Sequence, residues 1–209
     1  VQVVTGATPH GQGHETSWSM IVADQLGVAP DDVEVLHSDT AIVPEGMDTY
    51  GSRSLAVGGT AIWKATERVI ETARVIAAHM LEASSDDLDC ADGTFSVKGS
   101  PDKEVPLAGV AFGAFTAHDL PDGVEPHLQA HVSFDPTNIV FPFGTHIAVV
   151  EVDEETGAVE LLDYAAVDDC GNQINPLIME GQIHGGVVQG IAQALWDCLL
   201  YTSPSPRDS

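Results

Sequence analysis

The chain has 209 residues, and 44% of them are hydrophobic, which suffices for one substantial core. It carries 32 acidic residues against 7 lysines and arginines, a net charge of −25. This balance argues against nucleic acid and anionic membranes as partners, because both are bound through basic patches. Since neither a membrane-spanning apolar run nor a signal-peptide pattern occurs, the expected location is the cytoplasm.

Apolar periodicity along the chain predicts a mixture of helices and strands. The helices are expected over residues 15–26, 59–83, 105–117 and 176–196. The strands are expected over residues 1–5, 32–37 and 127–134, with hairpins over residues 88–97 and 146–167. Gly27 suits the C-cap of the first helix, and Asp92-Gly93 suits the turn of the first hairpin. Because the two kinds of element do not alternate regularly, the predicted fold class is α+β.

The most informative segment is residues 8–15 (TPHGQGHE), here called the first strip, directly before the first predicted helix. Gly11 and Gly13 let the backbone turn tightly and approach a ligand closely. The unpaired N–H groups at the start of a helix favour phosphate or another anion. The segment matches neither a Walker loop nor the Gly-x-Gly-x-x-Gly dinucleotide fingerprint. It predicts an anionic or polar cofactor held by backbone amides.

Two further segments have the same polar, turn-rich character ahead of a predicted helix. The second strip is residues 48–54 (DTYGSRS). The third strip is residues 168–176 (DDCGNQINP), and it is followed by the helical segment 177–186 (LIMEGQIHGG). Three such strips can converge on one large polar ligand. In so acidic a chain, Arg53 and backbone N–H groups are the expected shield for an anionic cofactor.

Several side chains have simpler interpretations than a catalytic one. The spacing of His10 and His14 would suit a metal on a helix, but the glycines favour a loop and a hydrogen-bonding role for His14. His184 is expected to be a core or interface residue. Cys170 has no identifiable base, which argues against a nucleophile, and Glu180 is expected to be a surface carboxylate. No metal ligand is predicted, and no metal- or cluster-binding pair is formed by Cys90, Cys170 and Cys198.

Four motifs follow one another along the chain: GQGHET at 11–16, TYGSRS at 49–54, VDDCGNQINP at 167–176 and EGQIHGG at 180–186. Together they resemble the molybdenum hydroxylases of the xanthine dehydrogenase family, and above all the molybdopterin-binding large subunit of the aerobic carbon monoxide dehydrogenase type. The resemblance implies a molybdopterin-binding domain over residues 1–196, which we expect to be truncated at both ends. Residues 197–209 are expected to be a non-native, disordered tail, because Ser-Pro-Ser-Pro breaks the last helix.

The resemblance also implies which residues contact the cofactor. Gln12 is expected near the oxygen ligands of the molybdenum, where it would act in catalysis. Contacts to the pterin or the phosphates are expected from Gly13, His14, Thr49, Tyr50, Ser52 and Ser54. Contacts to the dinucleotide end are expected from Asp169, Cys170, Asn175 and Gln182. The family's glutamate base belongs to a motif further downstream and its substrate-defining loop lies upstream, so neither is expected in this chain.

By the same resemblance the cofactor is molybdenum–molybdopterin cytosine dinucleotide. The implied activity is oxidation of carbon monoxide, an aldehyde or an N-heterocycle, with water as the oxygen source. Iron–sulfur clusters and FAD are expected only on partner subunits, in a dimer of heterotrimers, and the fragment alone is expected to be inactive. The alternative is a cofactor-free acidic protein-interaction domain, which the composition also allows.

Overall fold

The computed structural model describes residues 1–43 and 45–196. The chain divides into two compact units, the first spanning Val1–Ile139 and the second beginning at Val140. Both contain helices and strands, which confirms the predicted α+β class. The expected tail, residues 197–209, lies outside the described residues. That residues 1–196 act as one domain stays a prediction.

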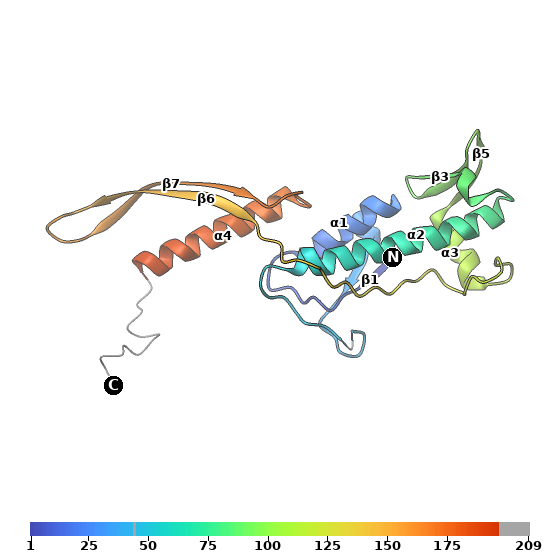
Figure 1. Ribbon diagram of the computed structural model, residues 1–209, viewed down its shortest axis with the longest axis horizontal. Coiled ribbons are helices and arrows are strands. Elements are labelled where there is room, and N and C mark those ends of the chain that lie inside the picture. Colours follow the sequence, from blue (N-terminus) through green and yellow to red (C-terminus); the bar gives the residue numbers. More distant parts are fainter. Residues whose placement is uncertain (44, 197–209) are drawn as a thin grey trace. The chain divides into compact units, whose positions relative to one another are not determined.

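The first unit is built around two long helices, α1 (His14–Leu26) and α2 (Thr60–Met80), which pack against each other (Figure 1). A short parallel sheet pairs β1 (Gln2–Val4) with β2 (Glu34–Leu36). An antiparallel sheet has the order β3 (Leu88–Ala91), β4 (Thr94–Val97) and β5 (Ser100–Pro106), and α3 (Leu107–Thr116) follows it. The short helical turns are η1 (Pro30–Asp32), η2 (Leu55–Gly59) and η3 (Ser85–Asp87).

Periodic apolar residues fix how these helices pack. Trp18, Val22 and Leu26 recur at four-residue spacing along α1 and are all buried. On α2 the buried positions include Ala73 and Ala77, whose small side chains leave room for neighbouring elements. The core cluster that α2 forms with α3 and the antiparallel sheet consists of Ala73, Ile76, Ala77, Ala78, Leu88, Phe95, Val105, Val110 and Ala114.

Two predicted turn features of the first unit meet in space. Gly27 ends α1 in the left-handed conformation, with φ 66°, and its N–H donates to the Ala23 carbonyl at 2.9 Å. A Cβ added to Gly27 would lie 2.2 Å from the backbone nitrogen of Gly93, which is in the β3–β4 turn. The C-cap and the hairpin turn are therefore both confirmed, and the absence of side chains lets their backbones touch.

The second unit consists of a hairpin and a helix. The strands β6 (Phe143–Val152) and β7 (Val159–Asp169) pair antiparallel, with an irregularity between Val149 and Val150. α4 (Pro176–Leu195) follows and contains no buried residue. The predicted hairpin and the predicted last helix are thus confirmed. None of the helices in the described part of the chain is both long and apolar enough to cross a membrane.

One predicted strand and two predicted helix boundaries were wrong, for local reasons. Residues 127–134 contain no strand, and they contact α2 through side chains instead. Arg68 donates to the His131 carbonyl at 3.1 Å, and the Lys64 ammonium lies 5.1 Å from the Phe134 ring centre. The helix expected over 59–83 ends at Met80, because Glu82 has a left-handed φ of 50°. The helix expected over 105–117 begins only at Leu107, because the residues before it pair in β5.

Candidate cofactor-binding site

The first strip forms a tight loop that leads into α1. Gly13 is the N-cap of α1, with φ 71°, and no side chain caps the first turn of the helix. Gly11 has φ 97° and open space where a side chain would stand. The half-buried Gln12 uses its side-chain oxygen to accept the N–H of His10, which closes the loop on itself. The predicted arrangement of glycines before uncapped helix amides is present, and it suits an anion.

His14 begins α1 and is buried beside this loop. Its ring centre lies 5.0 Å from that of Trp18, and its Nδ1 atom is buried without a hydrogen-bond partner. Burial lowers the pKa of His14 below 6.5, and contact with the Ala7 backbone acts in the opposite direction. His10 instead contacts Asp48 at 3.1 Å, and this hydrogen bond holds the pKa of Asp48 below its usual value. The two histidines therefore share no ligand: His10 contacts Asp48, and the His14 ring packs beside Trp18.

The second strip is hydrogen-bonded to the first. The N–H of Asp48 donates to the Gly6 carbonyl at 3.1 Å. The hydroxyl of Thr49 donates to the Thr8 carbonyl at 2.6 Å and lies 3.1 Å from the hydroxyl of Ser54. The structure therefore joins the first two strips through Thr8 and Thr49, and it places the Ser54 hydroxyl beside that of Thr49.

The second strip also contains an arginine and two neighbouring residues with left-handed backbone conformations. Arg53 donates to the Tyr50 hydroxyl at 3.1 Å, and its guanidinium carbon lies 5.2 Å from the ring centre. The positive charge of Arg53, which we expect to shield an anion, is therefore held against the Tyr50 side chain. Gly51 has φ 60° with open space around it, and Ser52 has φ 53°, a conformation that serine adopts only at a cost. Such strained positions concentrate at functional sites.

The third strip belongs to the second unit. Two of its predicted cofactor residues form hydrogen bonds to nearby backbone N–H groups. Asp169 accepts the N–H of Gly171 at 3.0 Å, which makes a turn. Asn175 caps α4 by accepting the N–H of Ile178 at 3.1 Å. Cys170 is exposed, with its sulfur 3.2 Å from that of Met179, and Gln182 is exposed on α4. A cofactor role for these four residues stays a prediction.

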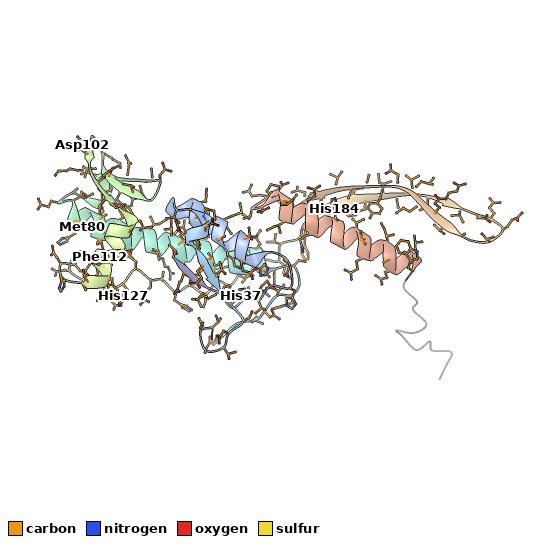
Figure 2. All side chains as sticks on the ribbon, turned by 180° about the vertical axis from the view of Figure 1, so that it is seen from behind. His37, Met80, Asp102, Phe112, His127 and His184 are labelled. Carbon is orange, nitrogen blue, oxygen red and sulfur yellow. The ribbon has the colours of Figure 1, made fainter. Side chains whose placement is uncertain are left out.

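The residues given a simpler interpretation are on the surface of α4. A carboxylate oxygen of Glu180 lies 3.9 Å from Nε2 of His184, and both side chains are largely exposed (His184 is labelled in Figure 2). Glu180 is therefore the expected surface carboxylate, whereas His184 is not a core residue of this chain. Among the described residues, no group of three or more histidines, cysteines or carboxylates is arranged to hold a metal ion.

The lowered pKa of His14 predicts an acid-sensitive first unit. A base whose pKa is lower in the folded state binds fewer protons when folded, so the free energy of unfolding falls as pH drops through this range. We expect full stability above pH 6.5 and a progressive loss below it, towards the lowered pKa of His14. Thermal unfolding at several pH values checks this, with His14→Gln as the variant that cannot titrate. An equally steep loss in His14→Gln would show that other groups cause it.

Comparison with known proteins places the chain in a family. The family model for the molybdopterin cofactor-binding domain matches residues 1–205, so the chain belongs to this family. It is 44% identical over 190 residues to the carbon monoxide dehydrogenase large chain of Hydrogenophaga pseudoflava, covering 91% of this chain and 23% of that one. The chain therefore spans about a quarter of the length of the curated relatives it matches.

Solved structures agree with this assignment. The fold is similar to that of carbon monoxide dehydrogenase from Oligotropha carboxidovorans, with a TM-score of 0.83 and 38% identity over 88% of this chain and 23% of that one. It is equally similar to quinoline 2-oxidoreductase from Pseudomonas putida 86, with a TM-score of 0.83 and 40% identity over 92% of this chain and 24% of that one. The family and fold expected from the four motifs are confirmed.

The first two strips fit a large anionic cofactor on their own geometry. The first turn of α1 offers uncapped N–H groups, and the buried Nδ1 of His14 has no partner. Gly11 and Gly51 both leave open space where a side chain would otherwise stand. Uncapped amides and close backbone access suit a phosphate-bearing ligand, and an unpartnered buried nitrogen is a polar atom that such a ligand could satisfy.

Proposed function

We propose that this chain is the cofactor-binding part of the large subunit of a molybdenum hydroxylase, and that it binds molybdenum–molybdopterin cytosine dinucleotide. The single observation that carries the proposal is that the first two strips are joined just before α1. The Thr49 hydroxyl donates to the Thr8 carbonyl, and no side chain caps the first turn of the helix that follows. The family assignment supports the same ligand class, because its description names a molybdopterin cofactor.

Each part of the site has a proposed task. The amides of the first turn of α1 bind negative charge, and Gly13 lets the ligand approach them. Arg53, held against Tyr50, adds a positive charge in a chain of net charge −25. Ser52 and Ser54 offer hydroxyls to pterin or phosphate oxygens, and the third strip with Gln182 binds the dinucleotide end.

The cofactor supplies the redox centre at which a small substrate is oxidised. The proposed substrates are carbon monoxide, an aldehyde or an N-heterocycle, with water as the oxygen source. The relatives differ here, since one acts as a carbon monoxide dehydrogenase and another as a quinoline 2-oxidoreductase. The task of Gln12 is to present its amide NH₂ group at the reacting centre, because its side-chain oxygen already accepts the His10 N–H. Iron–sulfur and flavin subunits are the proposed electron acceptors, in a dimer of heterotrimers.

Metal and pterin analysis of the intact large subunit tests the proposal. We expect about one molybdenum and one pterin per polypeptide, together with cytidine nucleotide after acid hydrolysis. A folded subunit that contains neither molybdenum nor pterin fluorescence would contradict the proposal. That result would favour the cofactor-free acidic interaction domain instead.

A further inference from the structure

A chain of hydrogen bonds that no motif indicates connects α1, the end of β2 and the first strip. His37 directly follows β2 and is labelled in Figure 2. Its Nε2 atom is 2.8 Å from a carboxylate oxygen of Glu15, in the first turn of α1. Its Nδ1 atom is 2.7 Å from the hydroxyl of Ser38, and that hydroxyl donates to the hydroxyl of Thr8 at 3.2 Å.

Thr8 extends this chain into the second strip. Its side chain contacts Ser38, while its backbone carbonyl accepts the hydroxyl of Thr49 at 2.6 Å. One residue is therefore held from two sides by segments about 30 and 41 positions away in the sequence. Thr8 therefore helps to join the two strips, together with the contact of His10 with Asp48 at 3.1 Å.

The backbone at this point is held in a costly conformation. Ser38 has φ 65°, in the left-handed region that residues other than glycine seldom adopt. Such a conformation persists only where surrounding contacts hold it. His37 is the residue best placed to do so, because its side chain is only 19% exposed and both ring nitrogens have partners.

We propose that His37 is a positioning residue for the cofactor site. It contacts no predicted cofactor ligand, and it acts by holding Glu15 on one side and Ser38 on the other, so that the first and second strips keep the spacing that the cofactor needs. Glu15 contributes a fixed anchor, because its own N–H and the His37 ring both lower its pKa and keep it ionised. This inference rests on the proposed function.

The test compares His37→Ala and His37→Gln with the wild-type intact large subunit. Glutamine can still donate to Glu15 but cannot reach both partners as the ring does. The matched control is His79→Ala, which breaks a histidine–carboxylate contact of 3.0 Å with Asp119 at the far end of α2. Two quantities are measured: molybdenum and cytidine nucleotide per polypeptide, and hydrogen exchange of residues 8–15 and 48–54.

We expect His37→Ala to lower cofactor content by up to roughly tenfold, because His37 lies one contact further out than the ligand-bonded groups whose loss costs at least that much. The faster exchange of His37→Ala should be confined to the two strips. His37→Gln should recover part of the cofactor content and part of the slower exchange. Cofactor content and exchange matching those of His79→Ala would overturn the inference and leave the proposed function intact. Faster exchange spread evenly over the first unit would also overturn it, as a general loss of stability. A wild-type subunit without cofactor would overturn the proposed function itself.

Discussion

Replacing Gln12 by alanine should lower turnover by ~10²–10³-fold, the usual cost of losing one preorganised donor at a reacting centre. The side-chain oxygen of Gln12 accepts the N–H of His10, so its NH₂ group is the end available to a ligand. The change removes no buried core volume, so the first unit should stay folded. The measurement is turnover per molybdenum atom in the intact enzyme, with the substrate that the wild type oxidises.

A second variant separates the two roles of this side chain. Gln12→Glu keeps an oxygen that can accept the His10 N–H but has no NH₂ group to donate. We expect its turnover per molybdenum to fall about as far as that of Gln12→Ala, while Gln2→Ala, which loses only an exposed contact with Glu34, stays at the wild-type value. Normal turnover in Gln12→Glu with a low value in Gln12→Ala would assign Gln12 to loop closure alone.

Replacing Trp18 by alanine should destabilise the first unit by ~3–5 kcal/mol, the usual cost of deleting a large buried aromatic side chain. Trp18 is 1% exposed, and it fills the space between His14 and the start of α2. A Cβ added to Gly59, the last residue of η2 and the N-cap of α2, would lie only 3.1 Å from the Trp18 ring, which shows how closely α1 approaches this point. Because Trp18 supports the first turn of α1, cofactor content should fall together with stability.

Trp63 is the matched control for this effect. It is the same residue type, on α2, but it is 45% exposed. Trp63→Ala should change the free energy of unfolding by about 1 kcal/mol or less, as is usual for surface positions. Urea unfolding followed by circular dichroism measures both variants. Equal losses in Trp18→Ala and Trp63→Ala would show that Trp18 does not carry the α1–α2 packing.

Local sequence signals predicted most of the elements and the two loops of the site. Glycine spacing predicted the first strip and the C-cap at Gly27, since both depend on backbone conformations that glycine favours. Residues 127–134 alternate like a strand but have no partner strand, so the strand predicted from this alternation does not form. The cap at Asn175 was predictable too, because asparagine followed by proline is a common helix start. The family resemblance assigned it to the cofactor instead.

Contacts between distant segments left no signal in the sequence. His37 and Glu15 are separated by 22 positions, and Thr8 and Ser38 by 30. Nothing in the local pattern around His37 distinguishes it from a histidine at the end of any strand. Its partners are set by the parallel pairing of β1 with β2, which brings residues after Thr5 beside residues after Leu36. A network of this kind becomes visible only when the fold is known.

Hydrogen exchange of the intact large subunit tests most directly whether the polar strips contact the molybdenum cofactor. Cofactor-loaded and cofactor-free preparations are compared peptide by peptide. We predict slower exchange in the loaded form over residues 8–15, 48–54 and 168–176, with the antiparallel sheet β3–β5 unchanged as the internal control. Equal exchange of all three strips in a preparation with full molybdenum content would contradict this contact.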